Sequence, residues 1–293
     1  MKNFPRLLGF KRGPLHICSV LFMILNFLLQ GESSNFSENF GILWGKDQFK
    51  LSNDGQTAHL TLDRASGSGF SSRNEYLFGS FNMRIKLIAG NSAGIVTAYY
   101  LSSATSAHDE IDFEFLGNLP RKGYHLQTNV FATGVGNREQ RIRLWFDPSA
   151  DFHNYSIVWN QNQIVFSVDS VPIRVFKNNE GVGVPYLKNQ PMKIISTLWN
   201  GEDWATDGGR VKVDWSKAPF VASYQAFEVD GCVASASSES CTGHWWDQSL
   251  FSGLSRDQLK KLRWVKRKYM FYDYCKDKSG RFSTPPPECA INP

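Results

Sequence analysis

The sequence has little of several features that mark common protein classes. Beyond residue 31, no apolar run approaches the about 20 residues that a membrane-spanning helix needs. No internal repeat is evident, and hardly any stretch has a helical period. The 293 residues include only five cysteines, and no two of these have Cys-x-x-Cys spacing. These absences argue against a membrane-embedded protein, a repeat protein, a mainly helical protein and a zinc site.

The amino terminus has the pattern of a secretory signal peptide. The apolar run Leu15–Leu29 ends at Gln30 and Gly31, and it follows a basic leader that contains Lys2, Arg6, Lys11 and Arg12. A run of about 15 residues fits the core of a signal peptide and is short for a membrane span. We therefore expect residues 1–31 to be a signal peptide and the mature protein to be secreted. Because the leader is long, an uncleaved membrane anchor is the alternative.

Removal of the signal peptide changes the charge of the protein. The formal net charge is +5, and four of these positive charges lie in residues 1–31, which leaves +1 on the mature chain. The mature chain therefore lacks the basic excess typical of nucleic-acid binding. We expect neither a nucleic acid nor, after signal removal, a membrane as a partner. Aromatic residues make up 14% of the chain, including nine Trp, and such a surplus fits either a cleft that stacks against sugars or ordinary core packing.

The cysteines of the mature chain are clustered. Cys18 lies in the signal peptide, and the other four lie in the last quarter of the chain: Cys232, Cys241, Cys275 and Cys289. An even number of cysteines in a secreted chain implies disulfides. Three pairings are possible, and we expect neighbours to pair, Cys232–Cys241 and Cys275–Cys289, because this closes two short loops.

Short alternating segments with turns between them run from about residue 40 to 230. In Gly79–Leu87, for example, four apolar side chains share one face. Turns are expected at 53–55 and at Ser66–Gly69. Many such segments predict a β-sandwich. Further strands are expected at Thr57–Asp63, Ile95–Leu101, Asn154–Trp159, Gln163–Val168, Ile173–Phe176 and Met192–Trp199.

The composition changes after residue 231. We therefore expect a sandwich domain at 32–231 and an extension at 232–293. Ser255 and Gln258 form a capping-box pattern that predicts the start of one helix, and an aromatic strand is expected at Tyr269–Cys275. The helix is strongly basic, which fits a solvated face or, as the alternative, adhesion to an acidic polymer. Its basic residues are Arg256, Lys260, Lys261, Arg263, Lys266, Arg267 and Lys268.

An acidic alternation stands out near residue 110. On a strand, it places Glu110, Asp112 and Glu114 on one face and the apolar residues between them on the other. Three carboxylates side by side repel one another, so an ordinary strand has no reason to carry them. The alternatives are a solvated strand face and a calcium or manganese site with oxygen ligands.

Glycosidic bond cleavage explains the triplet best. It needs one carboxylate that attacks the sugar and one carboxylic acid that protonates the leaving oxygen. Asp112 can help to hold the pKa values of the two glutamates apart. Cα atoms four residues apart on a flat strand are separated by about 13 Å. A retaining enzyme needs carboxyl groups about 5 to 5.5 Å apart, so we expect a strand that is concave toward the substrate.

The segment His108–Gly117 resembles the signature of the xyloglucan endotransglucosylase/hydrolase family, a plant branch of the retaining β-glucanases. The resemblance covers nearly the whole mature chain, including Ser66–Phe70, Gly90–Gly94, Gly136–Gln140, Leu144–Pro148 and Asp203–Thr206. It implies an all-β, concanavalin-like β-jelly-roll sandwich with a concave substrate-binding sheet and a disulfide-stapled extension. It also implies a monomer in the cell wall and apoplast that uses xyloglucan as donor and acceptor, without a cofactor or metal.

The resemblance assigns roles to individual residues. Glu110 would be the nucleophile, Glu114 the general acid/base and Asp112 their assistant. Sugar-binding roles would fall on Gln127, Thr128, Asn129, Asn137, Arg138, Glu139, Asp203, Trp204, Gly208 and Arg281.

Two further features bear on the resemblance. Members often carry a glycosylation sequon at the position of Asn118, which is absent here, whereas sequons stand at Asn35 and Asn154. The short segment between Gly117 and Thr128 favours transfer over hydrolysis by analogy. The alternatives are a xyloglucan hydrolase and a non-catalytic, lectin-like carbohydrate binder.

Overall fold

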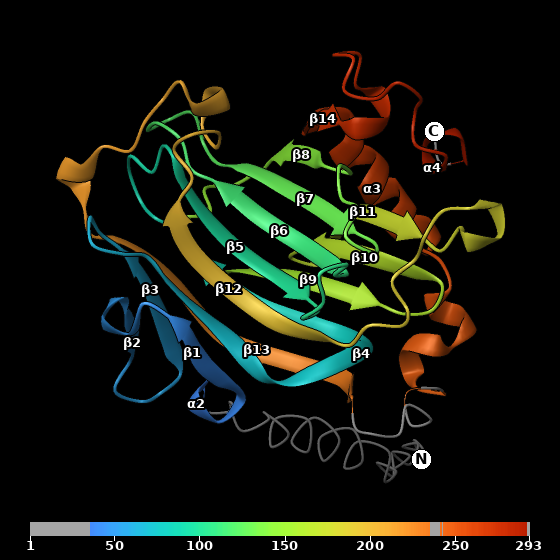
Figure 1. Cartoon of the computed structure of the whole chain (residues 1–293), viewed down its shortest axis with the longest axis horizontal. Coiled ribbons are helices and arrows are strands. Elements are labelled where there is room, and N and C mark those ends of the chain that lie inside the picture. Colours follow the sequence, from blue (N-terminus) through green and yellow to red (C-terminus); the bar gives the residue numbers. More distant parts are fainter. Residues whose placement is uncertain (1–35, 235–240, 242, 292–293) are drawn as a thin grey trace, which may run out of the picture. The chain divides into compact units, whose positions relative to one another are not determined.

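Strand β4 (Ser68–Lys86) links two sheets into one fold (Figure 1). Its first half pairs with β12 (Met192–Asn200), and its second half pairs with β9 (His153–Trp159). Between the halves, Phe78 and Gly79 have φ angles of 68° and 142°, so the backbone turns there. Glycine adopts such a positive φ without a steric penalty. One strand therefore belongs to both layers of a sandwich.

The structure is a computed structural model that describes residues 36–234, 241 and 243–291. The expected signal peptide and the sequon at Asn35 lie outside these residues. The other sequon lies in β9, where Asn154 Nδ2 donates a hydrogen bond to Ser156 Oγ at 3.1 Å, and its glycosylation stays a prediction. Among the described helices, none combines the length and the apolar character needed to cross a bilayer.

The two sheets are antiparallel throughout their described pairs. We call them the groove sheet and the back sheet. The groove sheet contains, in spatial order, β1 (Phe40–Trp44), the first half of β4, β12, β5 (Ile95–Ser102), β6 (Glu110–Leu116), β7 (His125–Phe131), β8 (Gln140–Arg143) and β14 (Met270–Asp273). The back sheet contains β2 (Phe49–Leu51), β3 (Thr57–Leu62), β13 (Phe220–Val233), the second half of β4, β9, β10 (Gln163–Val168) and β11 (Val171–Lys177). In Figure 1, β12, β5, β6 and β7 run side by side across the middle of the molecule.

Aromatic side chains fill the space between the sheets. Phe113 of β6 meets Phe166 of β10 with 5.3 Å between ring centroids, and Phe115 meets Tyr155 of β9 at 4.7 Å. All four rings are fully buried in edge-to-face pairs, which add about 0.5–1.5 kcal/mol each beyond their buried area. The apolar face of β6 is thus held against the back sheet, which leaves its acidic face for the opposite side.

The C-terminal extension is attached to both sheets. Helix α3 (Arg256–Lys268) begins at the predicted capping box, in which the Gln258 N–H donates to Ser255 Oγ at 3.3 Å and the Ser255 N–H donates to Gln258 Oε1 at 2.9 Å. The helix packs against β11, and its seven basic side chains are exposed, which fits a solvated face. Strand β14 pairs with β8 and so widens the groove sheet.

Two disulfides and two short helices complete the described chain. The expected pairings, Cys232–Cys241 and Cys275–Cys289, are both present. Because β13 runs to Val233, the last strand of the sandwich continues two residues past the expected boundary at 231. The short helices are α2 (Phe36–Asn39) and α4 (Glu288–Ile291).

One of the two expected turns, at Ser66–Gly69, is wrong in part, because Ser68 and Gly69 begin β4. The other expected turn, at 53–55, is present. A Cβ atom on Gly69 would lie 2.8 Å from Trp44 Nε1, and one on Gly67 would lie 2.1 Å from the carbonyl oxygen of Leu198. These glycines therefore allow close contact between neighbouring strands.

Candidate active site

The three acidic residues of β6 lie in a groove on the open face of the groove sheet. Glu110, Asp112 and Glu114 line this active-site groove, while Phe113 and its apolar neighbours point to the back sheet, as the alternation predicted. The groove has a volume of about 660 Å³, within the range of about 300–1,000 Å³ typical of ligand sites. Since β6 is hydrogen-bonded to β5 and β7 along its length, the acids stand on a backbone that is fixed on both edges.

The strand register gives each acid two neighbours across the sheet. These are Tyr100 and Asn129 beside Asp112, Ala98 and Gln127 beside Glu114, and Ser102 and Phe131 beside Glu110. Burial raises the pKa of the Tyr100 phenol, and the three acids raise it further. Tyr100 therefore stays a neutral hydrogen-bond donor in the groove.

Burial and mutual repulsion set the charge of the acids. Burial raises the pKa of Asp112 well above its usual range, and Glu110 and Glu114 raise it further. Burial also raises the pKa of Glu114, although a hydrogen bond from Gln127 opposes this rise. A buried carboxyl group that keeps its proton suits a general acid, which must donate that proton when the bond breaks.

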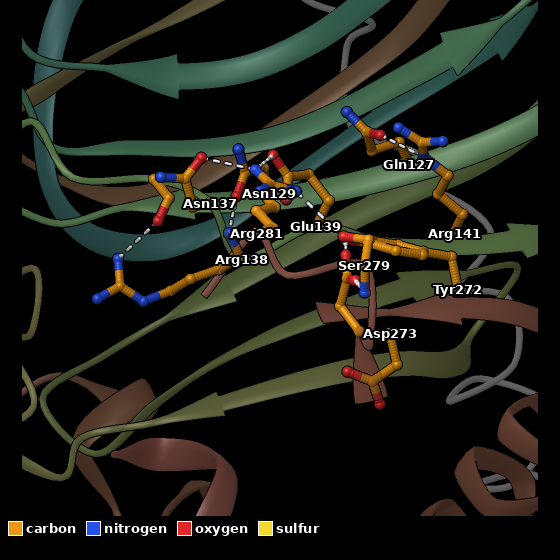
Figure 2. Close-up of polar contacts among 12 residues, drawn as sticks. Gln127, Asn129, Asn137, Arg138, Glu139, Arg141, Tyr272, Asp273, Ser279 and Arg281 are labelled. Atoms are coloured by element: carbon orange, nitrogen blue, oxygen red, sulfur yellow. Dashed lines mark hydrogen bonds and ion pairs between the residues drawn. The ribbon is translucent and has the colours of Figure 1, made fainter. Parts of the chain in front are cut away.

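A chain of side chains fixes the carboxyl group of Glu114. Gln127 Nε2 donates to Glu114 Oε2, and Arg141 Nε donates to Gln127 Oε1 at 2.6 Å. Figure 2 shows Arg141 reaching Gln127 from the neighbouring strand. Because Arg141 can only donate, it forces the amide of Gln127 to direct its N–H group at Glu114.

The carboxyl group of Glu110 lies at the opposite end of the triplet from Glu114. A hydrogen bond joins it to Asp112, and Glu110 Oε2 lies 3.9 Å from His108 Nε2. The His108 ring in turn packs on Phe131 with 5.3 Å between centroids. A carboxylate supported in this way on a paired strand can attack a sugar carbon without moving its backbone.

An arginine from the extension forms part of the groove wall. Arg281 Nη1 and Nη2 each donate to Glu139 at 2.8 Å, and Nη2 also donates to Asn137 Oδ1 at 2.6 Å (Figure 2). Glu139, Arg281 and Asn129 all line the groove. The Oδ1 atom of Asn129 accepts two backbone N–H groups, at 2.9 and 3.0 Å, so its amide N–H group is left to donate.

Two residues with expected sugar-binding roles point away from the groove. Thr128 is 2% exposed, and its Oγ1 accepts a hydrogen bond from Arg174 Nη1 at 3.0 Å between the sheets. Arg138 is 7% exposed, and its Nε donates to Glu288 Oε1 at 2.7 Å. The structure therefore gives both side chains a place in the packing of the protein, and neither lines the groove.

Three residues after β12 were expected to bind sugar, and one of them lines the groove. Trp204 is 36% exposed and lines the groove. Gly208 lines an adjoining hollow, which Trp204 also reaches. Asp203 lines neither space, and its carboxylate contacts Lys212 Nζ at 3.1 Å.

Sequence reasoning missed several groove residues. Tyr100 could have been found from the alternation of β5, in which it shares a face with Ala98. The remaining missed residues reach the groove only through pairing between strands that are distant in the chain. They are Trp44, Arg141, Thr197 and Trp199, whereas Phe131 follows from the alternation of β7, in which it shares a face with Gln127 and Asn129.

The metal alternative finds no support in the described ranges. Within 36–234, 241 and 243–291, no group of three or more His, Cys, Asp or Glu side chains has an arrangement that could hold a metal ion.

Comparisons with known proteins identify the fold and the family. The model of glycosyl hydrolases family 16 matches residues 36–217, and the model of the xyloglucan endo-transglycosylase (XET) C-terminus matches residues 240–289. Together they cover most of the sandwich and most of the extension. The chain belongs to the xyloglucan endotransglucosylase/hydrolase family. The resemblance inferred from His108–Gly117 is thereby confirmed.

Relatives in this family cover most of the chain. The probable xyloglucan endotransglucosylase/hydrolase protein 5 of Arabidopsis thaliana is 58% identical over 257 residues, or 87% of each chain. The xyloglucan endotransglucosylase protein 34 of Populus tremula x Populus tremuloides is 55% identical over the same length, again 87% of each chain.

Solved structures agree with the predicted jelly roll. A β-1,3-1,4-glucanase (lichenase) from a mouse hindgut metagenome matches with a TM-score of 0.55 and 25% identity, over 68% of this chain and 97% of that chain. A Bacillus licheniformis β-glucanase matches with a TM-score of 0.54 and 22% identity, over 70% and 95% of the two chains, and shows the fold alone. The expected all-β sandwich of this family is confirmed.

Proposed function

We propose that this family member cuts the β-1,4-glucan backbone of xyloglucan and transfers the cut segment to another xyloglucan chain. The observation that carries the proposal is the placement of Glu110 and Glu114 on one face of β6 in an open groove. A pair of carboxyl groups that faces one linkage is what retaining glycoside chemistry requires. The names of the relatives from Arabidopsis and Populus supply the substrate.

The reaction would proceed in two displacements. Glu114 protonates the departing glycosidic oxygen while Glu110 attacks the anomeric carbon, and a covalent glycosyl ester forms on Glu110 with inversion. Glu114 has then lost its proton and acts as a base toward the hydroxyl group of the acceptor. A second inversion restores the β configuration. Asp112, hydrogen-bonded to Glu110, would position the nucleophile and keep the charges of the glutamates apart.

Transfer requires that an acceptor sugar competes with water for the glycosyl ester. The segment between β6 and β7 is short, so it leaves the groove open beyond Glu114. Arg281 brings the extension to the groove and adds donors for sugar hydroxyls on the wall that contains Glu139. Both features support transfer as the main reaction and hydrolysis as a side reaction.

The site of action follows from the substrate. We propose that the mature protein is secreted and acts as a monomer in the cell wall and apoplast, where xyloglucan is found. The amino-terminal pattern and the two disulfides support an oxidising, extracellular setting.

The test replaces the nucleophile. Glu110→Ala should lower transfer and hydrolysis by roughly 10⁴-fold or more, because the covalent intermediate cannot form. Label from a xyloglucan oligosaccharide should enter long xyloglucan with the unchanged protein and not with this variant. Glu228→Ala is the matched control, since Glu228 is an exposed glutamate on strand β13 of the back sheet.

Three outcomes separate the alternatives. Incorporation of label indicates transfer, shortening of the polymer without incorporation indicates hydrolysis, and binding with neither indicates a non-catalytic binder. Azide added to Glu110→Ala should yield the α-glycosyl azide, because a single inversion replaces two. Full activity of Glu110→Ala, with unchanged thermal unfolding, would contradict the assignment.

A further inference from the structure

A second hollow adjoins the active-site groove and has an excess of basic side chains. It has a volume of about 670 Å³, and we call it the basic hollow. Arg141 and Trp204 line both spaces, so the groove continues into the hollow without a break in its lining. The charged and aromatic residues that line the hollow, besides these two, are Lys122, His125, Asp207, Arg210, Arg143 and Phe271.

The basic hollow lies on the Glu114 side of the catalytic acids. Leu116, two residues after Glu114 on the same strand face, lines the hollow and packs with Ala205. If the proposed function holds, Glu114 protonates the departing oxygen, so the space beyond it receives the leaving chain and then the acceptor. The inference rests on that function and places the hollow at the acceptor end.

The balance of ionisable side chains differs between the two spaces. The active-site groove contains four acids, Glu110, Asp112, Glu114 and Glu139, and two arginines, Arg141 and Arg281. The basic hollow contains four cations, Lys122, Arg141, Arg143 and Arg210, and one acid, Asp207. The acid is paired with Arg210 at 2.8 Å, so the other three cations outnumber the carboxylates of the hollow.

Two of these cations are available to a ligand. Lys122 and Arg143 are exposed, and within the described chain neither makes an ion pair with a carboxylate. The Arg143 guanidinium lies 4.8 Å from the centre of the Phe271 ring, and the His125 ring packs on the same phenyl group at 4.6 Å. Burial lowers the pKa of His125, and Arg143 and Arg141 lower it further. The positive charge therefore comes from ammonium and guanidinium groups, which stay charged at acid and neutral pH.

A neutral glucan can accept hydrogen bonds from these cations, whereas a carboxylate also gains charge–charge attraction and stronger, charge-assisted hydrogen bonds. We propose that the basic hollow is an acceptor subsite for the carboxylate groups of a uronic-acid-bearing glycan, so that the enzyme also transfers glucan segments to acidic acceptors. Guanidinium groups bind carboxylates through paired hydrogen bonds.

The state of the acids during transfer also predicts where the uronic acids lie. Glu114 has lost its proton in the glycosyl-ester state and repels a carboxylate close to the new bond, so the first acceptor sugars should be neutral. In the transfer step, the bond between C1 and the Glu110 carboxylate breaks, and a C1–O bond to the acceptor hydroxyl forms. The proton of that hydroxyl passes to Glu114, so atoms and charges balance without a further reactant.

The test compares two acceptors that differ only in charge. With xyloglucan as donor, transfer is measured to a labelled β-1,4-linked tetrasaccharide of four glucosyl residues and to one with glucuronosyl residues at its two reducing-end positions. The ratio of kcat/KM, charged over neutral acceptor, should exceed one at low salt and fall toward one at high salt, because salt screens exposed charges. Lys122→Gln combined with Arg143→Gln should lower this ratio by about tenfold, since each exposed pair contributes up to about fivefold.

The control separates this subsite from general charge effects. Lys261→Gln combined with Arg263→Gln removes two exposed cations from α3 that line neither space, and it should leave the ratio unchanged. A ratio of one or less in the unchanged protein, or no response to the Lys122 and Arg143 changes, would overturn the inference and leave the proposed function intact. Absence of transfer to both acceptors and to a xyloglucan oligosaccharide would overturn both.

Discussion

Gln127 links the acid/base to the charged residues of the neighbouring strand. Its amide donates to Glu114, which lowers the pKa of that carboxyl group against the effect of burial. Gln127→Met keeps the shape and removes the donor, so the pKa of Glu114 should rise. The protonated acid then persists to higher pH, and the alkaline limb of the kcat/KM profile should move to higher pH.

The pH profile distinguishes this effect from the loss of a sugar contact. Loss of a contact lowers kcat/KM by the same factor at every pH and leaves the limb in place. Gln161→Met, at an exposed turn after β9, should change neither the limb nor the rate. An alkaline limb of Gln127→Met that stays fixed or moves to lower pH would rule out the role of Gln127.

Asp112 should destabilise the folded protein at neutral pH. An aspartate has a pKa of about 3.9 in the unfolded chain, and burial raises it in the folded protein. The folded state binds the proton more tightly, so stability falls as pH rises above about 4 toward the raised pKa. Asp112→Asn removes this cost and should stabilise the protein by about 1 to 2 kcal/mol at pH 7, or about 2–4 °C in Tm per kcal/mol.

The same variant should show no gain in acid. Calorimetry near pH 3.5, where the carboxyl group is protonated in both states, should give equal Tm values for the two proteins. Activity should fall at both pH values, since Glu110 loses its assisting acid. A lower Tm for Asp112→Asn at pH 7 would contradict the pH-dependent cost.

At the level of single residues, period-two alternation predicted the acids but not all their neighbours. Alternation alone places the side chain of Thr128 on the other face of β7 from Gln127 and Asn129. A sugar-binding role for all three side chains therefore conflicts with strand geometry. Family resemblance supplied the three as a group, and the structure separates them. Tyr100 follows the same rule within β5, whereas Trp199 needs the pairing of β12 with β5, which no local pattern reveals.

Helix α4 is joined to the loop before β8 by a buried ion pair. Arg138 Nε donates to Glu288 Oε1 at 2.7 Å, and the pair is almost closed to solvent. Glu288→Ala leaves the Arg138 guanidinium buried without a carboxylate, which should cost about 3–5 kcal/mol of unfolding free energy in urea titrations.

A double variant tests whether Arg138 serves stability or sugar binding. Arg138→Met combined with Glu288→Leu removes both charges, so stability should recover most of the loss. The acceptor KM should then lie near that of the unchanged protein. A large rise in this KM with normal stability would instead support the sugar-binding role that the resemblance assigned to Arg138.

The elements themselves were predicted well where contacts are local. The capping box fixed the start of α3, and alternation located β3, β5, β10 and β12 to within a residue or two. The full length of β4 was missed, because Gly67 and Gly69 at its start resemble a turn but instead allow close contact with neighbouring strands. The addition of β14 to the groove sheet has no signal in its own sequence, since it depends on where the extension folds back.

For the molecule as a whole, the extension connects stability to the choice of acceptor. Arg281 lies inside the loop that Cys275–Cys289 closes, and it contacts Glu139 in the groove wall. Replacing both cysteines with serine should cost about 3 kcal/mol for a loop of this length. Because Arg281 is then less well placed, the ratio of transfer to hydrolysis should fall.

The other disulfide provides the control. Replacing Cys232 and Cys241 with serine should also lower stability, but neither cysteine lines the groove. The ratio of transfer to hydrolysis should therefore stay the same. An equal fall of this ratio in both variants would mean that it follows stability in general and not the position of Arg281.

Strand β6 has both edges paired and one face packed against the back sheet, so the backbone that carries its two glutamates is held in place during a turnover. The larger movement should then be made by the sugar. Its anomeric carbon moves from the departing oxygen to Glu110 in the first step and toward the acceptor hydroxyl in the second, while the strand backbone keeps its position. Substrates whose rings resist this flattening and displacement should react slowly even when they bind well. Selectivity in this fold would accordingly depend on how easily a glycosyl ring deforms as well as on which hydroxyl groups it presents.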